Sequence, residues 1–191
     1  MFRKILICIV LCMGLFSVGL RTCSAYQEQK VAIFPVFFNK NISVNKEVET
    51  IVAKALVNKF QMPLPTVVKF YQIIPEAEVV AALPVQLKDK IKKSKLANNL
   101  LTEVADKLNA DIVIAAEITS YRSEERMNRE GDRLQETHLA IRVITYHRPT
   151  GVFTEKRDHE FYFGDDISWG QPEYIADHMI YNLLNKIPDY R

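Results

Sequence analysis

The histidines and the paired aspartates are the side chains most able to bind a metal ion. Zinc sites place their ligands at short helical or Cys-x-x-Cys spacings, which the histidines here lack. We therefore interpret the four histidines as ordinary sheet-surface residues: His138, His147, His159 and His178. Asp165 and Asp166 precede Ser168, but the twelve-residue calcium-loop pattern is absent, and such a pair before a helix serves solvation or the helix dipole. The sequence predicts no metal and no cofactor.

A nucleophile or an acid–base pair is equally hard to find. The sequence has no Gly-x-Ser-x-Gly or Ser-x-x-Lys motif, and its six glycines form no phosphate-binding loop. Glycoside hydrolysis needs two carboxylates flanking a sugar cleft, and the acidic candidates are Glu124, Glu125, Glu130, Asp132 and Asp165. Most of them alternate with the arginines of the stretch 122–133. Mutual neutralisation therefore favours a solvated hairpin tip over an active site.

Recognition of a partner is the remaining role for the distinctive side chains. Tryptophan is enriched at binding hot spots, and Trp169 is the only one in the chain. The alternative, which we expect more often for such a residue, is that Trp169 fills the gap between the sheet end and the last helix. The charged hairpin tip is a second candidate surface, through Arg122, Arg126 and Arg129. The five lysines between Val85 and Lys95 predict a solvated segment, with a patch for an anionic partner as the alternative.

The first 25 residues resemble a secretory signal peptide. Arg3 and Lys4 precede an apolar run from Ile5 to Leu20, and small residues lead to a cleavage site between Ala25 and Tyr26. Two alternatives are an uncleaved anchor and lipidation at Cys23, although Arg21 and Thr22 fit a lipoprotein signal poorly. We expect an exported protein of the periplasm or cell envelope. Membrane contact would follow only from a retained signal or a lipid at Cys23.

Cleavage at that site would remove every cysteine of the chain. Cys8, Cys12 and Cys23 all precede Ala25, so residues 26–191 would contain no disulfide and no cysteine metal site. Of 25 basic residues, three are removed with the leader, which leaves 22 basic against 23 acidic residues. That balance argues against a nucleic-acid partner.

The hydrophobic pattern after the leader predicts a single α/β domain over residues 31–188, preceded by a polar lead-in at 26–30. Apolar runs predict strands at 31–38, 67–74, 111–121, 134–147 and 152–163, with Pro35 ending the first strand or placing it at an edge. Apolar spacings of three and four predict helices at 45–60, 76–83, 97–108 and from Pro172 onward. Asn45 is expected to cap the first helix, Asn109 to end the third, and the last to have an apolar face from Ile175 to Ile187.

The expected fold is a mixed sheet of about five strands in the order β-α-β-α-α-β-β-β-α, with helices packed on the sheet. Strands joined through helices should lie parallel, and the last three strands should form an antiparallel meander. A type I turn with a glycine bulge at Arg148–Gly151 would place Arg142 opposite Asp158, Leu139 opposite Phe161 and His159 opposite Ile141.

Two segments resemble a group of bacterial envelope proteins. They are the opening strand Val-Ala-Ile-Phe-Pro-Val at 31–36 and the helix-to-strand junction that contains Asn-Ala-Asp-Ile-Val at 109–113. The group has an anticodon-binding-like α/β domain. It includes the curli-export lipoproteins, the lipoprotein activators of peptidoglycan synthases and the amino-terminal domain of the Tol-system periplasmic protein. The resemblance implies binding to an envelope protein partner and carries no catalytic residue.

These observations favour a non-catalytic exported protein that acts as a protein-binding or assembly module, and not an enzyme. Two other classes stay open. One is a periplasmic or secreted hydrolase of cell-wall polymer, which would need Glu124, Glu130 or Asp165 in a cleft with a raised pKa. The other is a small-ligand module, which would need a largely apolar pocket with a few convergent polar groups.

Overall fold

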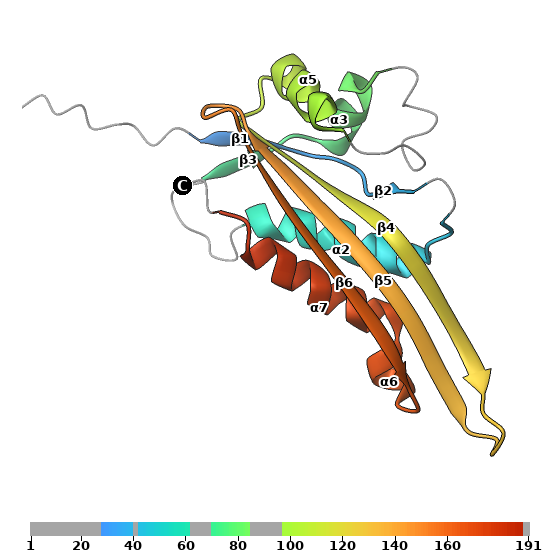
Figure 1. The fold of residues 1–191 in the computed structure, drawn as a ribbon. Helices are drawn as coiled ribbons and strands as arrows, with labels where there is room; N and C mark the ends of the chain where they lie inside the picture. The colour runs from blue at the N-terminus through green and yellow to red at the C-terminus, as the bar shows by residue number, and fades with distance from the viewer. Residues whose placement is uncertain (1–27, 40–41, 62–69, 85–96, 189–191) are drawn as a thin grey trace, which may run out of the picture.

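The protein is an α/β domain whose mixed sheet extends into a long three-stranded projection (Figure 1). The computed structural model describes residues 28–39, 42–61, 70–84 and 97–188. The leader, the lysine-rich segment 85–96 and the first part of the predicted strand 67–74 therefore lie outside the described residues. Within them, the elements follow the predicted order, with a short extra strand and a short extra helix.

The strands are β1 (Gln29–Ile33), β2 (Phe37–Phe38), β3 (Tyr71–Ile73), β4 (Ile112–Met127), β5 (Arg133–His147) and β6 (Val152–Gly164). The sheet order is β3-β1-β4-β5-β6, and β2 pairs with β4 beyond the end of β1. As predicted, β1 is parallel to β3 and β4, while β4, β5 and β6 form an antiparallel meander. Pro35 lies in the break between β1 and β2, and β1 is internal to the sheet and not at an edge.

Asparagine residues mark the start of one helix and the end of another. The helices are α2 (Lys46–Phe60), α3 (Glu76–Ala82), α5 (Asn98–Leu108), α6 (Ile167–Gly170) and α7 (Pro172–Asn185). The side chain of Asn45 accepts from the amide of Glu47 and caps α2, as predicted. Asn109 adopts a left-handed backbone conformation with φ of 49° and ends α5.

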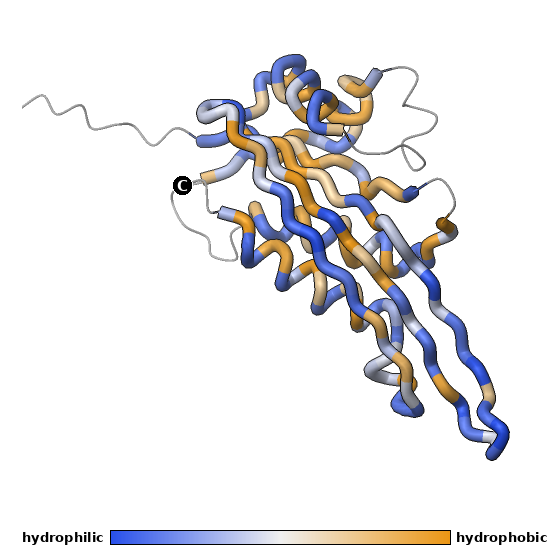
Figure 2. Tube along the Cα trace, in the orientation of Figure 1, coloured by the Kyte–Doolittle hydropathy of each residue, from blue (hydrophilic) through white to orange (hydrophobic). Residues whose placement is uncertain are grey.

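Helices cover the two faces of the sheet to different extents. Helices α2 and α7 pack against one face, where the predicted apolar stripe of α7 from Ile175 to Leu184 is buried. Helices α3 and α5 cover the other face only near β1 and the adjoining ends of β4, β5 and β6 (Figure 1). Hydropathy follows this division, and the far part of the meander is largely hydrophilic (Figure 2).

The predicted register between β5 and β6 is wrong by one residue. Arg142 lies opposite Arg157, Leu139 opposite Glu160, and His159 opposite Ala140. The reason is the turn, because His147 pairs directly with Val152 and the four residues between them close the hairpin without a bulge. Gly151, with φ of 67°, accommodates the left-handed position of that turn.

A β-bulge at Thr119 changes which side chains of β4 face the helices. Ile118 lies opposite Ile141, but Ser120 lies opposite Ala140, so Thr119 is the extra residue. Before the bulge the even-numbered residues of β4 face α2 and α7. After it, Tyr121 packs on that side, and Arg122, Glu124 and Arg126 face the opposite side.

Candidate functional site

The part of the meander beyond the bulge, here called the arm, consists of residues 120–127, 133–140 and 159–164. The prediction that 122–133 forms a charged hairpin tip is wrong for most of that range. Strand β4 continues to Met127, so Arg122 and Arg126 are strand residues, and only Arg129 lies in the connecting turn. Alternation of Arg and Glu with Tyr121 and Ser123 hid this strand, because no apolar face marks it.

The inner face of the arm, which faces the α6–α7 side, is held by buried polar contacts. Gln135 donates to the hydroxyls of Ser123 and Thr137, each at 2.9 Å, and Thr137 donates to the carbonyl of Gly170 at 2.6 Å. These bonds attach α6 to the arm. A Cβ at Gly170 would lie 2.5 Å from the ring of Tyr162, so only glycine allows this approach.

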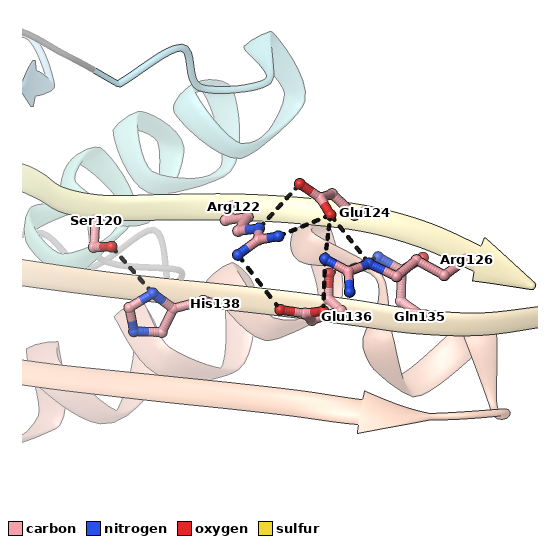
Figure 3. A network of polar contacts seen from close by, with 7 residues as sticks. All are labelled: Ser120, Arg122, Glu124, Arg126, Gln135, Glu136 and His138. Carbon is pink, nitrogen blue, oxygen red and sulfur yellow. Dashed lines mark hydrogen bonds and ion pairs between the residues drawn. The ribbon is translucent and has the colours of Figure 1, made fainter. Parts of the chain in front are cut away.

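The outer face of the arm carries a network of ion pairs on β4 and β5 (Figure 3). Arg122 binds both carboxylate oxygens of Glu124 at 3.0 Å, and Arg126 reaches the same carboxylate at 2.7 Å. Arg126 also pairs with Glu136 at 3.3 Å. Hydrogen bonds from Arg122 and Arg126 lower the pKa of Glu124 to about 2. An acid held ionised in this way cannot donate a proton near neutral pH, so Glu124 does not have the raised pKa that the hydrolase alternative would require of it.

The four histidines lie on three elements, β5, β6 and α7. His138 lies in the middle strand of the outer face, where its Nδ1 is 3.1 Å from the hydroxyl of Ser120. Across the described residues, no group of three histidine, cysteine or acidic side chains is placed to hold a metal ion. Asp166 caps α6, a helix that the sequence analysis did not predict, by accepting from the amide of Ser168 at 3.1 Å.

A buried charged ladder crosses the sheet where the cover of α3 and α5 ends. Arg142 donates to Glu117 at 3.0 Å and to Glu155 at 3.3 Å, and its side chain is only 11% exposed. Glu117 is 5% exposed. Sequence reasoning missed this ladder, although a lone glutamate and a lone arginine within apolar strand sequences were a usable signal.

A hollow of about 560 Å³ adjoins the ladder on the outer face. Most of its lining residues are polar or charged by type, although most of the surface they expose to the hollow is apolar: Asn39, Glu117, Thr119, Ala140, Ile141, Arg142, Arg157, Asp158 and His159. The many charged side chains differ from the few convergent polar groups that we expected of a small-ligand module.

Exposed apolar side chains gather at the carboxyl-terminal end of the chain. Trp169 is 57% exposed and stacks edge-on against Tyr174 with ring centroids 5.2 Å apart, so the expectation that it fills an internal gap is wrong. Tyr174 and Tyr181 share the face of α7 opposite its buried stripe. We call Trp169, Tyr174 and Tyr181 the aromatic stripe. It lies on the helical side, whereas Arg122 and Arg126 lie on the outer face, so the structure does not bring the predicted contact residues together.

Comparisons with known proteins give distant structural matches. No protein-family model and no curated protein sequence matches this chain. Lipoprotein GNA1162 from Neisseria meningitidis has a TM-score of 0.44 at 12% identity, covering 83% of this chain and 99% of its own. The PelC dodecamer from Paraburkholderia phytofirmans has a TM-score of 0.42 at 16% identity, covering 82% and 86%.

The LpoB carboxyl-terminal domain from Salmonella enterica has a TM-score of 0.40 at 14% identity, covering 77% of this chain and 93% of that one. Of these three structures, GNA1162 is named as a lipoprotein. At these TM-scores the likeness carries no functional argument, and the anticodon-binding-like assignment stays a prediction.

Proposed function

We propose that this protein is a non-catalytic, exported cell-envelope module that binds a protein partner through the aromatic stripe. The observation that carries the proposal is the exposure of Trp169 against Tyr174 on a rigid part of the fold. Both residues belong to helices attached to the sheet, α6 through Thr137 and α7 through its buried stripe. Exposed tryptophan and tyrosine on a fixed scaffold are typical of binding hot spots.

The ionisable groups support binding over catalysis. Glu124 is held by two arginines, Glu117 by Arg142, and Asp166 by its role as a helix cap. These acids are occupied by structural contacts, and hydrogen bonds lower the pKa of Glu124 and of Asp166, which favours their ionised forms. We therefore propose that the chain is not a hydrolase, and purified protein should release no soluble fragments from cell-wall polymer.

Export is the second part of the proposal and rests on the leader sequence. Arg3 and Lys4, the apolar run to Leu20 and the small residues before Tyr26 support cleavage after Ala25. No helix within the described residues is long and apolar enough to cross a membrane. The intact mass of the protein from its native host tests this. A mass starting at Tyr26 is expected, and one starting at Met1, or at Cys23 with acyl chains, would contradict it.

Site-specific photocrosslinking tests the partner surface. A photoreactive amino acid replaces Trp169 in the full-length chain expressed in the native host, and the matched control replaces the exposed Lys54 on α2. We expect a discrete adduct at position 169 that contains a second, different protein and is absent at position 54. Adducts that are the same at both positions, or none at position 169, would contradict the proposal.

A further inference from the structure

Strand β6 ends the sheet and has a free outer edge. It pairs with β5, and no other described strand pairs with it. The amide of His159 donates to the side chain of Asp158 at 3.0 Å and therefore points away from β5. Since backbone groups alternate along an antiparallel strand, the other odd-numbered amides of β6 also face the free edge. A free edge of this length is a template for another strand.

Natural edge strands often carry charged side chains that prevent another strand from pairing with them. The charges of β6, however, are complementary to those of a second β6 strand that runs antiparallel to it. In an antiparallel pair of two β6 strands centred on Arg157, Lys156 lies opposite Asp158 of the second copy, and Glu155 lies opposite His159. Each of these pairs occurs twice across the two-fold axis. Arg157 meets its own copy at the centre, where each guanidinium is already paired with Glu155.

The same arrangement also matches apolar residues. Phe153 comes to lie opposite Phe161, and Val152 opposite Tyr162. All pairs join an odd residue to an odd one or an even residue to an even one, so the inner and outer faces of the two sheets stay continuous. Phe161 is 61% exposed in the single chain and would gain an aromatic neighbour.

The distribution of exposed apolar side chains supports this side of the molecule as an interface. Apart from Met127, every large apolar side chain that is exposed among the described residues lies between Val152 and Tyr181, on β6, α6 or α7. Helix α7 packs on the sheet next to β6, and Lys186, just beyond its end, reaches Asp158 of that strand at 3.9 Å. Concentration of apolar surface on one edge is typical of interaction sites.

We propose that two copies of this chain associate edge to edge through β6, in the antiparallel register centred on Arg157. The sheets of the two copies then form one continuous sheet across the two-fold axis, and the same edge is used by both copies, which closes the dimer. The occupant of the edge is a second copy because the alternation of charge along β6 is satisfied by its own reversed sequence.

Charge exchange between positions 156 and 158 tests this dimer by analytical ultracentrifugation of the full chain. Lys156→Glu and Asp158→Lys should each raise the dimer dissociation constant by about tenfold, because each turns two attractive pairs into repulsive ones. A mixture of the two variants should recover dimer, since the carboxylate introduced at position 156 of one copy then faces the ammonium introduced at position 158 of the other. The control Lys54→Glu, an equal charge change on α2, should leave the dissociation constant unchanged. Circular dichroism verifies that each variant is folded.

Three outcomes would overturn the inference. One is a wild-type chain that stays monomeric at every concentration. Another is a dimer that neither single variant weakens. The third is a pair of weakened variants whose mixture does not associate, which would exclude the register centred on Arg157. Crosslinking at Trp169 to a different protein is independent of all three, so failure of the dimer and failure of the partner surface are distinguishable.

Discussion

The sheet outside the arm, here called the proximal half, shares strands β4, β5 and β6 with the arm, but the two regions are stabilised differently. In the proximal half both faces are covered, and the strands read as continuous apolar sequence, as from Ile112 to Ala116. In the arm, helices cover one face, and the contacts on that face are largely hydrogen bonds from Gln135 and Thr137. The backbone hydrogen bonds between β4, β5 and β6 therefore continue into the arm, where burial of apolar side chains on the outer face stops. The outer face of the arm is free for other roles.

The strongest way to break this arrangement is to remove one charge of the ladder where the two halves meet. Arg142→Met would leave Glu117 buried without its cation, and we expect a loss of about 3–5 kcal/mol in the free energy of unfolding. Urea denaturation measures the loss. The matched double variant Glu117→Met with Arg142→Met should recover much of the stability. A single variant within about 1 kcal/mol of wild type would contradict the importance of the ladder.

Truncation of one apolar side chain in each half measures the difference in burial directly. Ile114 is fully buried in the proximal half, and Ile114→Ala should cost about 2–5 kcal/mol of unfolding free energy. Phe163 on the outer face of the arm is the matched control, since it is 57% exposed, and Phe163→Ala should change stability by about 0.5 kcal/mol or less. Equal losses at the two positions would mean that the outer face is covered.

Addition of a single methyl group to α6 tests how closely this helix packs against the arm. Gly170→Ala would place a Cβ against the ring of Tyr162 and the side chain of Gln135, at a cost of about 1–3 kcal/mol. Thermal unfolding measures this loss, and Ser168→Ala in the same helix serves as the comparison. An unchanged melting temperature for Gly170→Ala would show that α6 moves freely from the arm.

The smallest expected effect concerns acid and the network on the outer face. Because the pKa of Glu124 is lowered from 4.5 to about 2 in the folded protein, its contribution to stability is complete above the unfolded value. That contribution is lost as the pH falls from about 4.5 towards 2. Carbon-detected NMR titration should give Glu124 a pKa near 2, rising towards its ordinary value in Arg122→Gln. An ordinary pKa in the wild type would show that the pairs do not persist in solution.

Sequence patterns predicted the proximal half well, and the arm poorly. The stripe of α7, the cap at Asn45 and the end of α5 at Asn109 follow from local rules and were confirmed. The strand from Arg122 to Met127 was missed, because both of its faces are polar or charged. Such a sequence has no alternation of apolar and polar residues, which is the pattern that identifies a strand. The register of β6 was missed by one residue, because turn type cannot be read from Arg-Pro-Thr-Gly alone.

The candidate contact residues show the same limit. The sequence could single out Trp169 by its type, but not its exposure, which depends on how α6 is held by Thr137 and Gly170. Arg122 and Arg126 were chosen as neighbours in sequence, and they are neighbours in space because they share one face of β4. Their separation from the aromatic stripe is a tertiary property that no local pattern contains.

The extra residue at Thr119 has a consequence for how this chain can change over evolutionary time. Pairing of Thr119 into the ladder would exchange the two sides of every following residue of β4, turning Tyr121 outward and Arg122 towards the helices. Gain or loss of matched residue pairs nearer the turn at Asn128–Asp132 would instead lengthen or shorten the arm without disturbing the domain. The bulge therefore separates a segment whose length is constrained from one whose reach is free to vary among descendants.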